Sequence, residues 1–320
     1  VIEAFYGGQP GGGKAQPLAG ILICGILKGM ICTPFGFKKM EDVSGGDQVV
    51  NPDGSVARVV AVHDHGFRDD RYEVTFIDGA STVVASDHLW TMRNTKRPPK
   101  ADRQVLTPDG EWVYTPYRNV TTSMLYELVE QAKKRSASQE GEPSWPIIPL
   151  TKPVQFTVTS RYPDSRWPID PYTLGVLLGD GCITSIASLG ITSADEEIVG
   201  RIKGVRVTQV RSGCNQYCFE VAEKVQILEG LEYLGILGKD SSNKFIPEQY
   251  KVCPLDIRWE LIRGLMDTDG TADSRGHASF TSISKQLAVD VQWIVRSLGF
   301  KATMTDKEPF YRNAEGDKVI

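Results

Sequence analysis

The segment TLGVLLGDG, residues 173–181, decides how the second half of this chain folds. Apolar residues and glycines follow one another without a charge until Asp180, and a glycine comes directly after it. The segment IRGLMDTDG, residues 262–270, repeats this arrangement and ends in Asp269 and a glycine. A pattern that recurs at matching positions indicates one structural unit used twice. The matching positions are Gly175 with Gly264, Asp180 with Asp269, and Gly181 with Gly270.

The repeated segments predict two helices that pack closely and bring two carboxylates together. Small residues on one helix face let two backbones approach, and Gly175, Gly179 and Gly264 are placed to do this. A carboxylate near a helix C-terminus is disfavoured by the helix dipole, and two carboxylates that meet there repel each other. A divalent cation offsets both costs, because hard cations prefer oxygen ligands. We therefore predict that Asp180 and Asp269 bind Mg²⁺ or another divalent cation, which suits phosphodiester hydrolysis.

Both segments resemble the motifs of LAGLIDADG, or DOD-type, homing endonucleases. Blocks that are similar to the intein-borne members of this family follow in the family order. They are IDPYTLGVLLGDG, KFIPEQY and SFTSISKQLAVDVQWIVRSLGF, at residues 169–181, 244–250 and 279–300. The resemblance covers about residues 150–305. It implies an α+β endonuclease domain with pseudo-twofold αββαββα repeats, which makes metal-dependent double-strand cuts as a monomer on a long, asymmetric DNA site.

The same resemblance assigns roles to single residues. Asp180 and Asp269 would be the catalytic metal ligands, and Lys244 would be an auxiliary base near the scissile phosphates. Asp267 stands at the first acid position of the motif, but Leu178 occupies the matching position of the first copy. That difference favours a structural role for Asp267.

The first half of the chain carries the signals of an all-β domain. Short β-branched runs alternate with turn dipeptides, which predict hairpins. The turns are at Asp53-Gly54, Asp78-Gly79 and Asp109-Gly110. One helix is expected at about residues 121–137, where apolar residues recur with a helical period. Pro, Gly and Ser are frequent near residues 136–150, so we predict a linker there, between domains at residues 15–135 and 151–320.

Two segments of this β-rich half resemble the intein splicing domain, which has a Hint-type fold. They are TPFGFKKMEDVSGGDQVVNPDG at residues 33–54 and STVVASDHLW at residues 81–90. The resemblance makes His88 the residue that protonates the leaving amide nitrogen during splicing. The sequence departs from the family at Ala85, where threonine is usual, and Trp90 resembles a minority intein class that needs no nucleophile at its first residue. Autocatalytic protein splicing is implied for the full-length intein, with its host flanks, the exteins, as partners.

The glycine-rich start of the chain, residues 1–14, resembles the P-loop of a host protein. A loop of this kind cradles phosphates through its backbone N–H groups. The residues that fit the P-loop pattern are Gly8, Gly13 and Lys14. The next residue is Ala15, although a P-loop has a Ser or Thr at this position to hold magnesium. An intein that begins at Ala15 inside a phage terminase-like ATPase would explain why the P-loop pattern stops at Lys14. Alternatively the intein begins at Cys24, which has the usual spacing to the next block and whose thiolate would be the attacking nucleophile.

Composition and chain length set the remaining expectations. The 320 residues favour two domains, and the net charge of −4 gives no overall indication of a nucleic-acid partner. No segment reads as a membrane span or a secretion signal, so we expect a cytoplasmic protein of a bacterial or phage-infected cell. The closing blocks of a splicing domain are not found before Ile320. The alternative functions are a P-loop ATPase of a DNA-packaging terminase and a catalytically inactive DNA-binding remnant.

Overall fold

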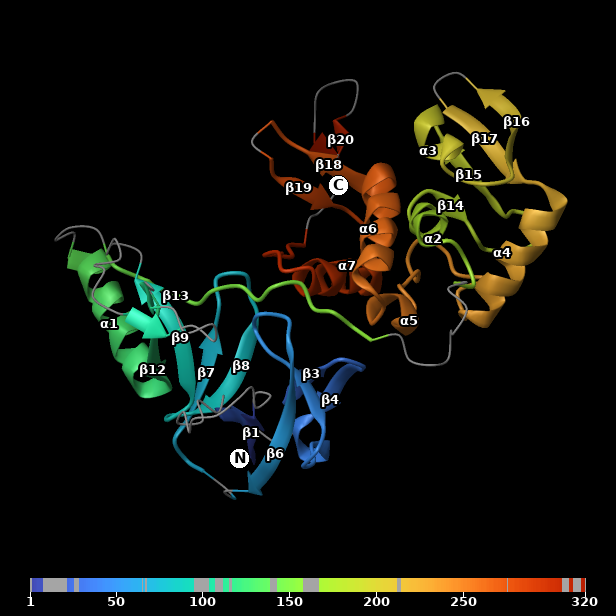
Figure 1. The fold of residues 1–320 in the computed structure, drawn as a ribbon. Helices are drawn as coiled ribbons and strands as arrows, with labels where there is room; N and C mark the ends of the chain where they lie inside the picture. Colours follow the sequence, from blue (N-terminus) through green and yellow to red (C-terminus); the bar gives the residue numbers. More distant parts are fainter. Residues whose placement is uncertain are drawn as a thin grey trace. The chain divides into compact units, whose positions relative to one another are not determined.

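The computed structural model describes most of the chain, which divides into two compact units. The units are Val1–Thr157 and Val158–Ile320 (Figure 1). The described residues are 2–7, 22–25, 29–64, 66, 68–94, 104–106, 112–114, 117–138, 143–157, 167–211, 214–274, 276–306, 311–312 and 318–319. Within these ranges, no helix combines the length and the apolar character needed to cross a membrane.

The first unit consists mainly of short antiparallel strands. Its largest sheet has the order β2-β1-β6-β5, β9 lies between β12 and β13, and the other strands form two-stranded hairpins. The strands are β1 (Ile2–Gly7), β2 (Leu22–Gly25), β3 (Met30–Thr33), β4 (Gly36–Lys39), β5 (Gln48–Val50), β6 (Val56–Asp64), β7 (Arg71–Thr75), β8 (Ser81–Ala85), β9 (Leu89–Asn94), β10 (Gln104–Leu106), β11 (Trp112–Tyr114), β12 (Arg118–Thr121) and β13 (Pro146–Ile147). Two helical segments accompany them, the 3-10 helix η1 (Met40–Asp42) and the helix α1 (Thr122–Ser138).

The turn dipeptides of the first unit lie where the sequence predicts them. Asp53-Gly54 connects β5 to β6, and Asp78-Gly79 connects β7 to β8. Both glycines have positive φ, +84° and +79°, which favours glycine at these positions. The dipeptide at residues 109–110 lies outside the described residues. The predicted helix agrees with α1, and the described part of this unit is β-rich with one α-helix.

The segment predicted as a linker, residues 136–150, belongs to the first unit. Its beginning continues α1 to Ser138, and β13 pairs with β9. Beyond it, the N–H of Lys152 donates to Pro52 O at 2.8 Å, and the N–H of Thr157 donates to Pro34 O at 2.7 Å. These long-range hydrogen bonds hold Lys152 and Thr157 to two turns of the first unit, and the division of the chain falls after Thr157.

The second unit uses the order helix, strand, strand, helix, strand, strand twice, and forms a mixed α+β structure. The first set is α2 (Pro171–Leu178), β14 (Gly181–Cys182), β15 (Gly190–Ser193), α3 (Glu196–Gly200), β16 (Val205–Arg211), β17 (Cys214–Phe219), with α4 (Val221–Tyr233) after it. The second set is α6 (Leu255–Asp269), β18 (Gly270–Ala272), β19 (Ala278–Phe280), α7 (Lys285–Ser297), β20 (Tyr311–Arg312) and β21 (Lys318–Val319), preceded by α5 (Glu248–Lys251). The four strands of the first set form one antiparallel sheet with the order β14-β15-β17-β16.

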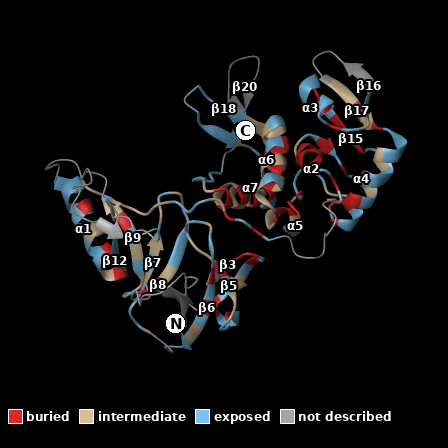
Figure 2. Cartoon of the chain, viewed as in Figure 1, coloured by how far each residue is buried: buried red, intermediate tan, exposed pale blue. Residues whose placement is uncertain are grey.

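Helix α2 lies at the centre of the second unit. All eight of its residues are buried, and Figure 2 shows α2 in the buried colour, whereas the helices around it are buried only in part. The helix begins at Pro171, and the side chain of Asp170 accepts hydrogen bonds from the N–H and the hydroxyl of Thr173, each at 2.9 Å. Asp170 thereby satisfies one of the N–H groups that a helix start leaves without a partner. An apolar run with a proline and an N-cap at its start therefore forms a short, fully buried helix.

Candidate metal centre

The helices α2 and α6 pack backbone against backbone at two glycines. A Cβ atom on Gly175 would lie 2.4 Å from the carbonyl oxygen of Leu261. A Cβ atom on Gly264 would lie 2.3 Å from the carbonyl oxygen of Tyr172. Neither distance leaves room for a side chain, so the close approach depends on glycine at both positions.

Gly179 extends this contact to the C-terminal ends of the two helices. A Cβ atom there would lie 2.0 Å from the hydroxyl of Thr268, which itself donates to the carbonyl oxygens of Gly264 and Leu265 on α6. The close contact therefore continues to the ends of the helices, where Asp180 and Asp269 follow.

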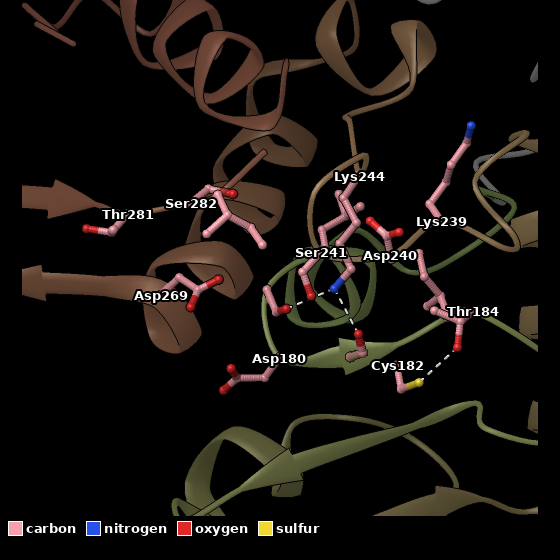
Figure 3. Close-up of a pocket in the computed structure, with 15 residues that line it drawn as sticks. Asp180, Cys182, Thr184, Lys239, Asp240, Ser241, Lys244, Asp269, Thr281 and Ser282 are labelled. Carbon is pink, nitrogen blue, oxygen red and sulfur yellow. Dashed lines mark hydrogen bonds between the residues drawn. The ribbon is translucent and has the colours of Figure 1, made fainter. Parts of the chain in front are cut away.

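Asp180 and Asp269 face one cavity of about 610 Å³ (Figure 3). Asp269 is the last residue of α6, and Asp180 lies in the turn between α2 and β14. The two residues are far apart in the sequence, and the packing of the helices brings them together. The other polar side chains around the cavity come from Cys182, Thr184, Lys239, Asp240, Ser241, Lys244, Thr281 and Ser282.

The electrostatic environment of the two acids disfavours their charged forms. Burial raises the pKa of Asp180, the negative charge of Asp269 raises it further, and the ammonium of Lys244 opposes both effects. Burial also raises the pKa of Asp269, again opposed by Lys244. Two carboxylates that share one cavity are stabilised by a cation between them.

The donor set fits Mg²⁺ better than a transition metal. In the part of the chain that the structure describes, no group of three or more His, Cys, Asp or Glu side chains is arranged to hold a metal ion. A cation here would therefore take the carboxylates of Asp180 and Asp269 and fill its other positions with water or phosphate oxygens. Mg²⁺ is commonly bound in this way, by one or two carboxylates together with substrate phosphates and water.

The pKa shifts predict that amide variants stabilise the metal-free protein. A carboxyl whose pKa is raised on folding contributes stability below its unfolded pKa, and this stability is lost as the pH rises through the folded pKa. Asp180→Asn and Asp269→Asn should therefore each raise the Tm in EDTA at pH 7, and this gain should shrink towards about pH 4. Calorimetry at both pH values measures the difference, and a lower Tm at pH 7 for both variants would contradict it.

Lys244 lies beside the acids but makes its hydrogen bonds to the backbone. Only 3% of this residue is exposed. Its ammonium donates to the carbonyl oxygens of Leu177, Gly179 and Gly181 at 2.9, 2.9 and 2.8 Å (Figure 3). Burial lowers the pKa of Lys244 to about 8, although both carboxylates oppose this shift.

Asp267 lies in a different set of contacts from the metal centre. It accepts a hydrogen bond from the hydroxyl of Tyr172 at 2.8 Å and pairs with the guanidinium of Arg201 at 3.2 Å. The same guanidinium pairs with Glu260 at 3.2 Å and lies 3.7 Å above the ring of Tyr172. These contacts tie α2 and the end of α3 to α6, which agrees with a structural role for Asp267. The sequence carried no signal for Arg201, because its partners lie far along the chain.

In the first unit, His88 is half-buried in the loop between β8 and β9. Its ring meets the ring of Trp90 edge-on, with 5.0 Å between the centroids. Burial lowers the pKa of His88, and the charge of Asp87 opposes this effect. The carbonyl oxygen of His88 accepts from the N–H of Thr122 at 2.9 Å, at the start of α1. The helix start therefore holds this loop in place.

The remaining predicted site residues have no described side-chain geometry. Gly8, Gly13, Lys14 and Ala15 lie outside the described residues. The backbone of Cys24 pairs with Glu3 in the sheet, but the side chain of this cysteine is not described. The described residues therefore do not distinguish between Ala15 and Cys24 as the start of the intein.

Comparison with known families gives a match in the second unit. Residues 256–319 match the LAGLIDADG-like domain. The matched segment contains Asp269, most of α6 and the whole of α7. The first motif and Asp180 lie outside it.

Three curated relatives are similar to the chain over different lengths. The replicative DNA helicase DnaB of Mycobacterium intracellulare is 31% identical over 314 residues, which are 97% of this chain and 47% of the helicase. A DNA gyrase subunit of Mycobacterium kansasii is 24% identical over 176 residues, 48% of this chain and 32% of the gyrase polypeptide. The replicative DNA helicase DnaB of Nostoc sp. is 28% identical over 153 residues, 41% of this chain and 17% of the helicase.

The chain spans less than half the length of each of these relatives. Their names are those of a gyrase polypeptide and a replicative helicase. The terminase-like host that the glycine-rich start suggested therefore has no support among them.

Proposed function

We propose that the second unit is a LAGLIDADG-type homing endonuclease that makes metal-dependent double-strand cuts at a specific DNA site. The observation that carries this proposal is that Asp180 and Asp269 reach one cavity at the ends of two closely packed helices. The match of residues 256–319 to the LAGLIDADG-like domain supports it independently.

Asp180 and Asp269 would hold the divalent cation in this mechanism. When bound, the cation stabilises the charge that develops on the scissile phosphate. Asp180 and Asp269 come from the two halves of the unit, so each half contributes one ligand to the shared cavity. The raised pKa values of both acids agree with a site that is most stable when a cation neutralises it.

The four-stranded sheet offers a polar face to DNA. Along β15, Ile191 is buried in the core while its neighbour Thr192 is exposed, as expected for alternating sides of a strand. Thr192 pairs with Gln216 on β17, and Arg206 is exposed on β16 at the sheet edge. Side chains of these types donate and accept hydrogen bonds at the edges of bases.

We propose further that this endonuclease belongs to an intein. A replicative helicase and a gyrase are different proteins, yet the chain is similar to part of each. An intein inserted into each of these two proteins explains the two similarities more simply than a fold common to the helicase and the gyrase. His88 would then protonate the leaving amide, and the host of this chain would be a DnaB-like helicase rather than a terminase.

Cleavage of an uninterrupted host gene tests the proposed function. A plasmid with an intact DnaB helicase gene should be linearised when the chain and Mg²⁺ are present, and should stay circular in EDTA. The matched control is the same gene interrupted by the intein coding sequence, which should resist cleavage because the insertion splits the target. Failure to cut the intact gene under any divalent cation would refute the endonuclease proposal.

Binding to the target should weaken steeply as the salt concentration rises. Neutralising six to ten phosphates releases counterions, so affinity should fall by roughly 10³–10⁵ between about 50 and 200 mM salt. Fluorescence anisotropy with labelled target DNA in EDTA measures this slope. Since the net charge is −4, a steep slope requires the basic residues to gather on one face, and a flat response would contradict binding in a DNA groove.

A further inference from the structure

Lys244 is anchored at both its backbone and its side chain. Its N–H donates to Asp240 O at 3.1 Å, and its own carbonyl oxygen accepts from the hydroxyl of Ser284 at 2.6 Å. Ser284 is the N-cap of α7 and is fully buried. The N-terminus of α7, a helix of the second set, therefore fixes the backbone from which the Lys244 side chain extends.

The ammonium of Lys244 completes the C-terminal end of α2. The last carbonyl groups of a helix have no partner within it, and a positive charge there is favoured by the helix dipole. Two of the three accepting carbonyls, those of Gly179 and Gly181, belong to the residues on either side of Asp180. The backbone of Asp180 is thus held on both sides by one buried side chain.

We propose that Lys244 is a positioning residue that aims the Asp180 carboxylate at the cavity it shares with Asp269. An ammonium has three N–H donors and no acceptor, and here all three donors are used on carbonyl oxygens. To act as a base, the nitrogen would first have to lose a proton, which removes one of these three donors and leaves a lone pair facing a carbonyl oxygen. The consequence for cleavage rests on the proposed endonuclease function, but the positioning itself does not.

Hydrogen exchange of the metal-free chain tests the positioning directly. Lys244→Met removes the donors and keeps the length of the side chain, so amides of residues 178–182 should exchange about tenfold faster or more. Lys251→Met is the matched control, because Lys251 is also partly buried but pairs with Glu248 and Asp290. It should leave exchange at residues 178–182 unchanged.

Lys244→Arg distinguishes a positioning role from base catalysis. It also tests the proposal if Lys244→Met fails to fold. Arginine can donate to several carbonyls but stays protonated, so it cannot act as a base. If exchange at residues 178–182 stays slow in this variant, cleavage should stay within about tenfold of wild type. Slow exchange with complete loss of cleavage would overturn the proposal, as would wild-type exchange in Lys244→Met. A wild-type chain that never cuts DNA would refute the endonuclease function and leave the exchange result standing.

Discussion

Asp180→Asn and Asp269→Asn each lower the rate of DNA cleavage by roughly 10³-fold or more, equivalent to ~4 kcal/mol of lost transition-state stabilisation. An amide keeps the shape of the carboxylate but removes the charge that attracts a cation. Because each acid comes from a different helix and the two share one cavity, neither can replace the other. DNA affinity in EDTA should stay within a few fold of wild type, because phosphate contacts elsewhere dominate binding.

The rate of plasmid linearisation at saturating protein measures the loss of cleavage in the two variants. A gel shift in EDTA measures their affinity for DNA. Asp240→Asn is the matched control, since Asp240 lines the same cavity. Its carboxylate accepts hydrogen bonds from the N–H and the hydroxyl of Ser242, at 2.8 and 2.6 Å. We therefore do not expect Asp240 to bind the cation, and Asp240→Asn should cleave DNA like the wild type. Full cleavage by either the Asp180 or the Asp269 variant would end the assignment of the metal centre. Specific binding without any cleavage by the wild-type chain would identify an inactive remnant.

Gly264→Ala lowers the free energy of unfolding of the second unit by roughly 3 kcal/mol or more, at the upper end of the effects of overpacking. The added methyl group would lie 2.3 Å from the carbonyl oxygen of Tyr172 and 2.9 Å from the backbone nitrogen of Val176. Both are backbone atoms of α2, so the clash is relieved only if the helices move apart. Since domains are stable by only about 5–15 kcal/mol, this loss is a large part of the total.

Urea unfolding, followed by hydrogen exchange in α2 and α6, measures this loss for the second unit. Gly200→Ala in α3 is the control, because a Cβ atom there meets no atom within 4 Å. Alanine favours a helix over glycine, so the control should be neutral or slightly more stable. Equal stability of the Gly264 variant and the control would show that the helices tolerate a wider spacing than the structure indicates.

Local patterns predicted much of the fold because they depend on neighbours in the sequence. The repeated run of apolar residues and glycines that ends at Asp180 predicts α2, and the Asp-Gly dipeptides at residues 53–54 and 78–79 predict two hairpins. Composition predicts a linker at residues 136–150, whereas the division between the two compact units falls after Thr157. Pro, Gly and Ser show only that no regular helix continues, and the pairing of Pro146–Ile147 with β9 depends on residues far away in the sequence.

By itself, the sequence determined that two similar helices occur, each with a glycine on its packing face and an acid at its end. Only the tertiary structure decided that Asp180 and Asp269 face one cavity, that Lys244 bonds the backbone around Asp180, and that Asp267 pairs with Arg201. The physical reason is that helix period, capping and turn preference act over a few residues. The direction of a side chain at the end of a helix depends on which distant backbone and charges pack against it.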